Sequence, residues 1–249
     1  MTSGPRTDRP RSLAVRPSLA LVLMSLAAAT WLTVDLVLAG PLSRFDEFVS
    51  DQVGVWEVRE NPIGYAISWV ITQIGGQRVL ILVVMSVLVG YLCWTRRTLQ
   101  PLVRTLLALA LLTVTVYAFK YGLGRTAPEY PGGSLLHGDG QSYPSGHTAN
   151  AVLMWGLATW LTVYYGLPAR VQGVFATLFV VSPIASAVTM LLLNFHWVTD
   201  LVTGAAVGVI LLWIVHVVFD GPLGTVDRLS ANPESTTSAD EFDTCLRRC

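Results

Sequence analysis

Six long apolar runs constrain this chain more than any other feature of its sequence. Each is near the length of about 20 residues that an α-helix needs to cross about 30 Å of hydrocarbon. Only 13% of the 249 residues are charged, whereas soluble domains carry about 25%. The sequence therefore predicts an all-α polytopic membrane protein with six transmembrane helices. The runs cover roughly residues 18–39, 77–94, 100–119, 147–166, 172–193 and 199–218.

Three parts are predicted along the chain. Residues 1–17 form a basic cytoplasmic segment, residues 18–218 a six-helix membrane domain, and residues 219–249 a tail rich in Ser, Thr and acidic residues that we expect to be disordered. The first run is longer than the core of a cleaved signal peptide, so it is expected to remain as a helix. Residues 61–76 are too short and glycine-ended to cross, and predict an interfacial or half-inserted helix.

The three cysteines are Cys93, Cys245 and Cys249. Their odd number, with two of them in a polar tail, argues against a disulfide framework. We interpret them as structurally silent, with lipidation of the tail or a redox pair as the alternatives.

The placement of arginine predicts the orientation of the helices, because cytoplasmic loops carry an excess of positive charge. Eight arginines near helix ends fall on one side if both termini are cytoplasmic. Residues 41–61 carry five acidic residues and are expected to form a loop on the outer side. The arginines on the cytoplasmic side are Arg6, Arg9, Arg11, Arg16, Arg96, Arg97, Arg104 and Arg170.

Polar residues converge on the outer face in this arrangement. Lys120, the only lysine of the chain, ends the third run, His147 begins the fourth, and His196 and Asp200 follow the fifth. Two antiparallel crossings separate the two histidines, so the chain returns them to the same depth. A lone lysine at a helix end often serves as a membrane anchor, but Arg125 follows closely on the side where positive charge is not expected.

The stretch YPSGHTAN has the features of a helix start that binds an anion. Ser145 is a plausible N-cap, and Gly146 lets the backbone approach a ligand closely. Free N–H groups at such a start favour a phosphate, and His147 in the first turn could exchange a proton with it. Lys120 and Arg125 would add positive charge. The alternative is that these residues only begin a helix, with His147 at the interface.

The stretch NFHWVTD offers a second half of a site. His196 and Asp200 are spaced i and i+4, so on a helix the carboxylate can hold one imidazole nitrogen and leave the other exposed. The pair could instead close a helix end or form half of a zinc site. No Cys, Glu or third His is placed nearby to complete a zinc ligand set, apart from His137, and no metal is predicted.

These residues resemble the type 2 phosphatidic acid phosphatases, a family of integral-membrane lipid phosphatases related to soluble acid phosphatases and vanadium haloperoxidases. The resemblance covers residues 60–218. It departs from the family pattern where two arginines are expected, since Ala127 and Met190 stand there. Arg125 is expected to replace the first of these arginines. The matching residues are Lys120, Pro128, Pro144, Ser145, Gly146, His147, His196 and Asp200.

The resemblance implies a covalent mechanism without metal or cofactor. His196 would attack phosphorus, Asp200 would orient it, and His147 would protonate the leaving oxygen. Water would then hydrolyse the phosphohistidine. The residues expected to bind the phosphate oxygens are Lys120, Ser145 and Gly146, together with Arg125.

The leading hypothesis is a lipid phosphatase at the outer face of a bacterial plasma membrane. Its substrate would be a polyprenyl phosphate or diphosphate or a phospholipid monophosphate, and the reduced positive charge favours a monophosphate. The alternatives are a phosphotransferase with an alcohol acceptor and, because of Ala127 and Met190, a non-catalytic lipid-binding or flipping protein. The net charge of +0 gives no support to nucleic-acid binding, and the sequence predicts no oligomeric state.

Overall fold

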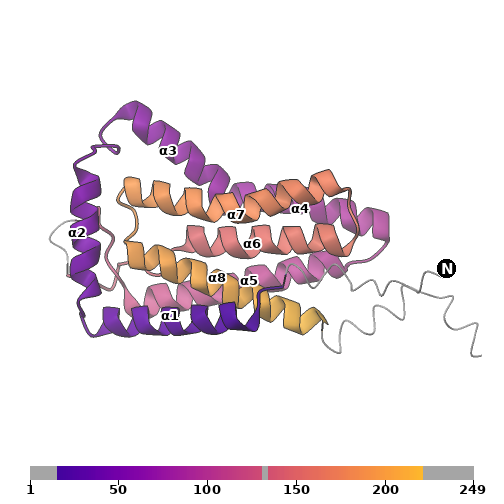
Figure 1. Ribbon diagram of the computed structural model, residues 1–249, viewed down its shortest axis with the longest axis horizontal. Helices are drawn as coiled ribbons and strands as arrows, with labels where there is room; N and C mark the ends of the chain where they lie inside the picture. The colour runs from indigo at the N-terminus through magenta and orange to yellow at the C-terminus, as the bar shows by residue number, and fades with distance from the viewer. Residues whose placement is uncertain (1–15, 131–133, 221–249) are drawn as a thin grey trace, which may run out of the picture. The chain divides into compact units, whose positions relative to one another are not determined.

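The computed structural model describes residues 16–130 and 134–220, and helices dominate both ranges (Figure 1). No strand occurs in these ranges, where an isolated bridge joins Arg125 to Leu136, so the all-α prediction is confirmed for this part of the chain. The helices are α1 (Leu19–Val37), α2 (Leu42–Gly54), α3 (Pro62–Gly75), α4 (Arg78–Arg96), α5 (Gln100–Leu123), α6 (Gly146–Tyr164), α7 (Ala169–Leu192) and α8 (Val198–Asp220).

The chain divides into two compact units, residues 1–213 and residues 214–249. The contacts described below lie within the first unit. Most of the predicted N-terminal segment and nearly all of the predicted tail, with Cys245 and Cys249, fall outside the described residues. Cys93 is a free thiol.

Five segments of the described chain are long and apolar enough to cross a membrane. Helix α6, the fourth predicted crossing, is not among them. Every residue from Thr148 to Thr162 is buried, so this helix is enclosed by protein. Its Asn, Thr and Gly residues therefore do not face lipid. The number of six crossings stays a prediction. The five segments are Leu19–Val37, Pro62–Arg96, Gln100–Leu123, Ala169–Leu192 and Val198–Phe219.

Small residues allow α6 to pack closely against its neighbours. Figure 1 shows α6 between α7 and the first part of α8, and α7 packs extensively against it. On α8, Gly204 faces the carbonyl oxygen of Ser145, and a Cβ atom at Gly208 would come within 2.7 Å of the Cβ of Val152. Glycines spaced by four residues present one smooth face, which lets two helix backbones approach.

Residues 41–61 do not form the loop that the sequence suggested, because most of them fold into α2. The carboxylate of Asp35 accepts a hydrogen bond from the N–H of Leu42 (3.2 Å) and so caps the start of this helix. Helix α2 crosses one end of the bundle in Figure 1. Its inner face carries Asp46, which is only 1% exposed, and this acid therefore reaches the interior of the protein.

The corner between α3 and α4 rests on the first turns of α6. Asn150 donates a hydrogen bond from Nδ2 to the carbonyl of Gly76 (3.1 Å), and Trp155 donates from Nε1 to the carbonyl of Gly75 (3.3 Å). A Cβ atom at Gly76 would lie 2.5 Å from Ser186 Oγ and 2.8 Å from the carbonyl oxygen of His147. The start of α4 is thus fixed beside the start of α6. Whether α3 lies at a membrane interface stays a prediction.

Candidate active site

The loop that follows α5 folds back on itself at one end of the bundle. Gly124 ends α5 in the left-handed conformation (φ 61°), which glycine adopts without strain. Its carbonyl accepts a hydrogen bond from the N–H of His137 (2.7 Å), and the carbonyl of Arg125 accepts one from the N–H of Ser142 (2.9 Å). The loop therefore brings Ser142 next to the end of α5.

The start of α6 is held by a serine cap, as the sequence predicted. Ser145 has extended backbone angles, and its Oγ accepts from the N–H of Thr148 (3.5 Å). Its own N–H donates to the carbonyl of Asp200 (3.0 Å), which ties α6 to α8. Ser145 is 0% exposed, so its hydroxyl serves the cap and does not line the cavity described below. Its predicted role on the phosphate stays a prediction.

Tyr143 anchors the same loop to α1. It is fully buried, and its hydroxyl shares a hydrogen bond of 2.7 Å with Thr33 Oγ1. Burial raises the pKa of this phenol above its ordinary value. The residue just before Pro144 is therefore a structural support for the α6 start.

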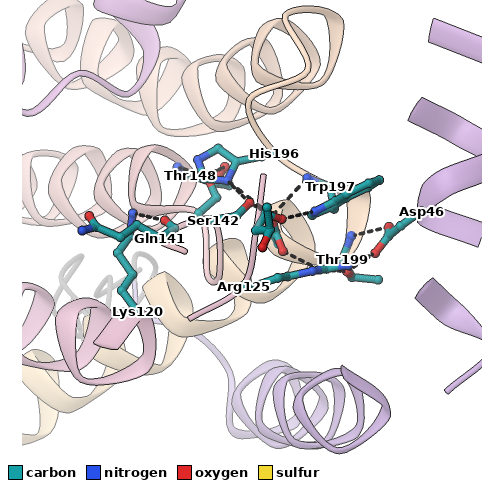
Figure 2. Close-up of polar contacts among 12 residues, drawn as sticks. Asp46, Lys120, Arg125, Gln141, Ser142, Thr148, His196, Trp197 and Thr199 are labelled. Atoms are coloured by element: carbon teal, nitrogen blue, oxygen red, sulfur yellow. Dashed lines mark hydrogen bonds and ion pairs between the residues drawn. The ribbon is translucent and has the colours of Figure 1, made fainter. Parts of the chain in front are cut away.

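His196 and Asp200 come together as their spacing suggested, with His196 just before the first turn of α8. The distance from His196 Nδ1 to Asp200 Oδ2 is 3.4 Å. Ser142 donates its hydroxyl hydrogen to the same Oδ2 and places its Oγ 3.3 Å from Nδ1. Since both neighbours of Nδ1 are acceptors, this nitrogen carries the hydrogen and Nε2 keeps its lone pair. The contacts are drawn in Figure 2.

His147 and His196 face one cavity. Their ring centroids lie 6.4 Å apart, and both residues line a cavity of about 620 Å³ together with Lys120 and Ser142. Lys120 donates a hydrogen bond from Nζ to the carbonyl of Gln141 (2.6 Å), which leaves its other N–H donors available. Gly146 lines a smaller cavity of about 250 Å³, which also contains Lys120 and His147.

Arg125 is not among the residues that line either of these cavities. Its Nη1 donates to Asp200 Oδ1 (2.5 Å) and to Thr199 Oγ1 (2.6 Å), and its Nη2 donates to Asp46 Oδ2 (2.7 Å). The Arg125 side chain is 2% exposed, and its guanidinium lies over the ring of Trp197. In Figure 2, Lys120 lies at the left, and Arg125 and Asp46 lie to its right. Both terminal nitrogens of Arg125 thus bond to buried carboxylates, which gives this residue a structural role. Its predicted phosphate-binding role stays a prediction.

Sequence reasoning missed Asp46 and Ser142. Asp46 accepts hydrogen bonds from the N–H of Thr199 (3.1 Å) and from its hydroxyl, and so caps the start of α8. Nothing in the local sequence separates Asp46 from the other acidic residues of 41–61. Ser142 lies three residues before Ser145, and only Ser145 was assigned a role from the sequence, as the N-cap.

No group of three or more His, Cys, Asp or Glu side chains that could hold a metal ion occurs in residues 16–130 and 134–220. His137 lines the larger cavity, but its side chain is 63% exposed and lies 3.7 Å from the carboxylate of Asp139. It does not join the two histidines of the cluster.

Known proteins resemble this chain in sequence and in fold. Residues 101–221 match the PAP2 superfamily. Over 144 residues the chain is 32% identical to a lipid A 1-phosphatase of Porphyromonas gingivalis, in a match that covers 55% of this chain and 29% of that protein. This chain therefore spans less than a third of the relative.

The fold resembles the crystal structure of a transmembrane PAP2 type phosphatidylglycerolphosphate phosphatase from Bacillus subtilis. The TM-score is 0.60 with 21% sequence identity, over 81% of this chain and 94% of that one. Together with the apolar helices, the likeness makes this a multi-pass membrane protein. The resemblance seen in the sequence is confirmed over residues 101–221, which match the PAP2 superfamily.

Proposed function

We propose that this protein is a membrane lipid phosphatase that hydrolyses a lipid phosphate monoester or diphosphate through a phosphohistidine. One observation carries the proposal: the Nδ1 of His196 is held by Asp200 and Ser142, so the lone pair of its Nε2 is available in a cavity shared with His147 and Lys120. A nucleophile held by an orienting carboxylate is the arrangement that covalent catalysis requires.

The first chemical step forms the phosphoenzyme. Nε2 of His196 attacks phosphorus, and the bond between phosphorus and the leaving oxygen breaks. Asp200 stabilises the positive charge that develops on the imidazole, as the acid of a catalytic triad does. His147 donates a proton to the leaving oxygen, and the lipid alcohol or lipid phosphate departs.

The second step regenerates the enzyme. His147, now neutral, takes a proton from a water molecule, whose oxygen attacks the phosphorus of the phosphohistidine. The N–P bond breaks, its electron pair returns to Nε2 of His196, and inorganic phosphate leaves. Lys120 and the free N–H groups at the start of α6 stabilise the negative charge on the phosphate in both steps. Ser145 contributes by fixing this helix start.

The orientation belongs to the same proposal. With six crossings and both termini in the cytoplasm, the cavity opens at the outer face of a bacterial plasma membrane. A single cysteine introduced at the exposed residue Ser134, in a variant without the native cysteines, should react with an impermeant thiol reagent added outside intact cells. Labelling only after the membrane is opened would invert the orientation.

The function is tested with purified protein and a panel of lipid phosphates. Wild-type protein should release inorganic phosphate and form an acid-labile phosphoprotein. His196→Ala should form none, and His147→Ala should hydrolyse far more slowly. Equal hydrolysis by all three proteins would refute the mechanism, and no hydrolysis by the wild type would favour a binding protein. Transfer of phosphate to an added alcohol in place of release would identify a phosphotransferase.

A further inference from the structure

The smaller cavity beside the active site is lined by an arginine that has no role in the proposed mechanism. It has a volume of about 250 Å³ and shares Lys120 and His147 with the larger cavity, whereas His196 lines only the larger one. The two cavities therefore meet at Lys120 and His147. The smaller one is completed by Gln77, Arg78, Tyr117, Gly146 and Asn150, among others.

Arg78 is the charged residue that this cavity adds. It is the first residue of α4, and the α3–α4 corner that precedes it is bonded to α6 by Asn150 and Trp155. Its position beside the start of α6 is therefore set by the fold. The Cζ of Arg78 lies 5.9 Å from the ring centroid of Tyr117, which places the guanidinium at the wall of the cavity.

The guanidinium of Arg78 is available for a ligand, in contrast to that of Arg125. None of the described residues forms an ion pair or a hydrogen bond with it. Arg78 lines the same cavity as Lys120 and His147. Two cations beside a helix N-terminus repel one another unless an anion lies between them. The smaller cavity is thus suited to an anion.

The direction of the reaction decides which anion this is. Phosphorus must lie between Nε2 of His196 and the leaving oxygen, which is next to His147. The leaving group therefore extends past His147, away from His196, and this is where the smaller cavity begins. A neutral lipid alcohol gains nothing from cations at that position, whereas a lipid phosphate leaving group would form charge-assisted hydrogen bonds there.

We propose that Arg78, together with Lys120, binds the departing phosphate of a lipid diphosphate and makes the protein prefer diphosphates over monophosphate esters. This inference rests on the proposed function and replaces the preference for monophosphates that the sequence suggested. In the reaction the His196 N–P bond forms while the bond from phosphorus to the bridging oxygen breaks. The electron pair of that bond leaves with the lipid monophosphate, whose oxygen receives the proton of His147.

The test compares farnesyl diphosphate with farnesyl monophosphate in detergent micelles, since the two differ only in the leaving group. Wild-type protein should have the higher kcat/KM for the diphosphate. Arg78→Gln should reduce kcat/KM for the diphosphate by about 10-fold to 100-fold, the range of one hydrogen bond to a charged group, and for the monophosphate by less than about threefold. Arg78→Lys should retain part of the preference. Farnesyl monophosphate, as product, should also inhibit Arg78→Gln more weakly than wild type.

Arg97→Gln is the matched control, because Arg97 is the C-cap at the other end of the same helix and lines neither cavity. It should behave as the wild type on both lipids. An equal loss on both lipids in Arg78→Gln, or an unchanged preference, would overturn the inference while leaving the lipid phosphatase intact. Absence of hydrolysis of either lipid by wild-type protein would instead overturn the proposed function.

Discussion

Replacing Arg125 with alanine separates a structural role for this residue from the phosphate-binding role that the sequence suggested. Arg125 bridges Asp46 and Asp200, whose side chains are 1% and 0% exposed. The substitution leaves two buried carboxylates without their shared cation. Removing one partner of a buried ion pair costs about 3–5 kcal/mol.

The expected loss is large enough to measure by thermal unfolding in detergent. At about 2–4 °C per kcal/mol for a chain of this size, the Tm should fall by about 6–20 °C. Arg59→Ala is the matched control: Arg59 pairs with Glu129 at 2.7 Å, but its side chain is 43% exposed. Such a surface pair contributes at most about 1 kcal/mol, so its Tm should change little.

A second substitution tests the cause of the loss. Adding Asp46→Asn to Arg125→Ala removes one of the two stranded charges, so the double variant should be more stable than Arg125→Ala alone. Simple addition of the two losses would contradict the buried network. An unchanged Tm in Arg125→Ala, together with a raised KM for the lipid phosphate, would refute the structural assignment and restore the phosphate-binding role.

Three further expectations follow from the site. Ser142→Ala should lower kcat by about 10-fold or more with little effect on Tm, because Nδ1 of His196 loses one of its two acceptors; an unchanged kcat would exclude an orienting role. Gly76→Ala should lower both Tm and activity, since the added Cβ meets Ser186 Oγ at 2.5 Å and the carbonyl of His147 at 2.8 Å; wild-type behaviour would show that the corner is not tightly packed. Hydrolysis should continue after dialysis against EDTA, because Lys120 and the α6 start supply the charge in this mechanism; recovery only on addition of a divalent cation would contradict it.

The helices could be predicted from the sequence because hydrophobic length is a local property. The run that starts near residue 100 became α5, and Ser145 was recognised as a cap because such caps act within one turn. Helix α2 was missed because its pattern is acidic and amphipathic, which is equally typical of an outer loop.

The partners of the charged residues could not be predicted, because they come from distant parts of the chain. Arg125 lies two residues from the position where the family has its arginine, which favoured a phosphate-binding role. Its partner Asp46 is 79 residues away in sequence, and no local pattern records such a pairing. Arg78 was overlooked for a similar reason: at the start of an apolar run, an arginine has the usual features of a membrane-edge residue.

The burial of α6 on all sides also has a consequence for how the protein is made. A segment enters a bilayer on its own when its side chains are apolar enough to partition there, and α6, unlike α5 and α7, is not among the segments that meet this requirement. The helix that carries His147 therefore depends on its neighbours for entry, and α7, with which it packs extensively, is one partner for joint insertion. Substitutions in α7 that leave the active site untouched should then still reduce the amount of protein that reaches the membrane.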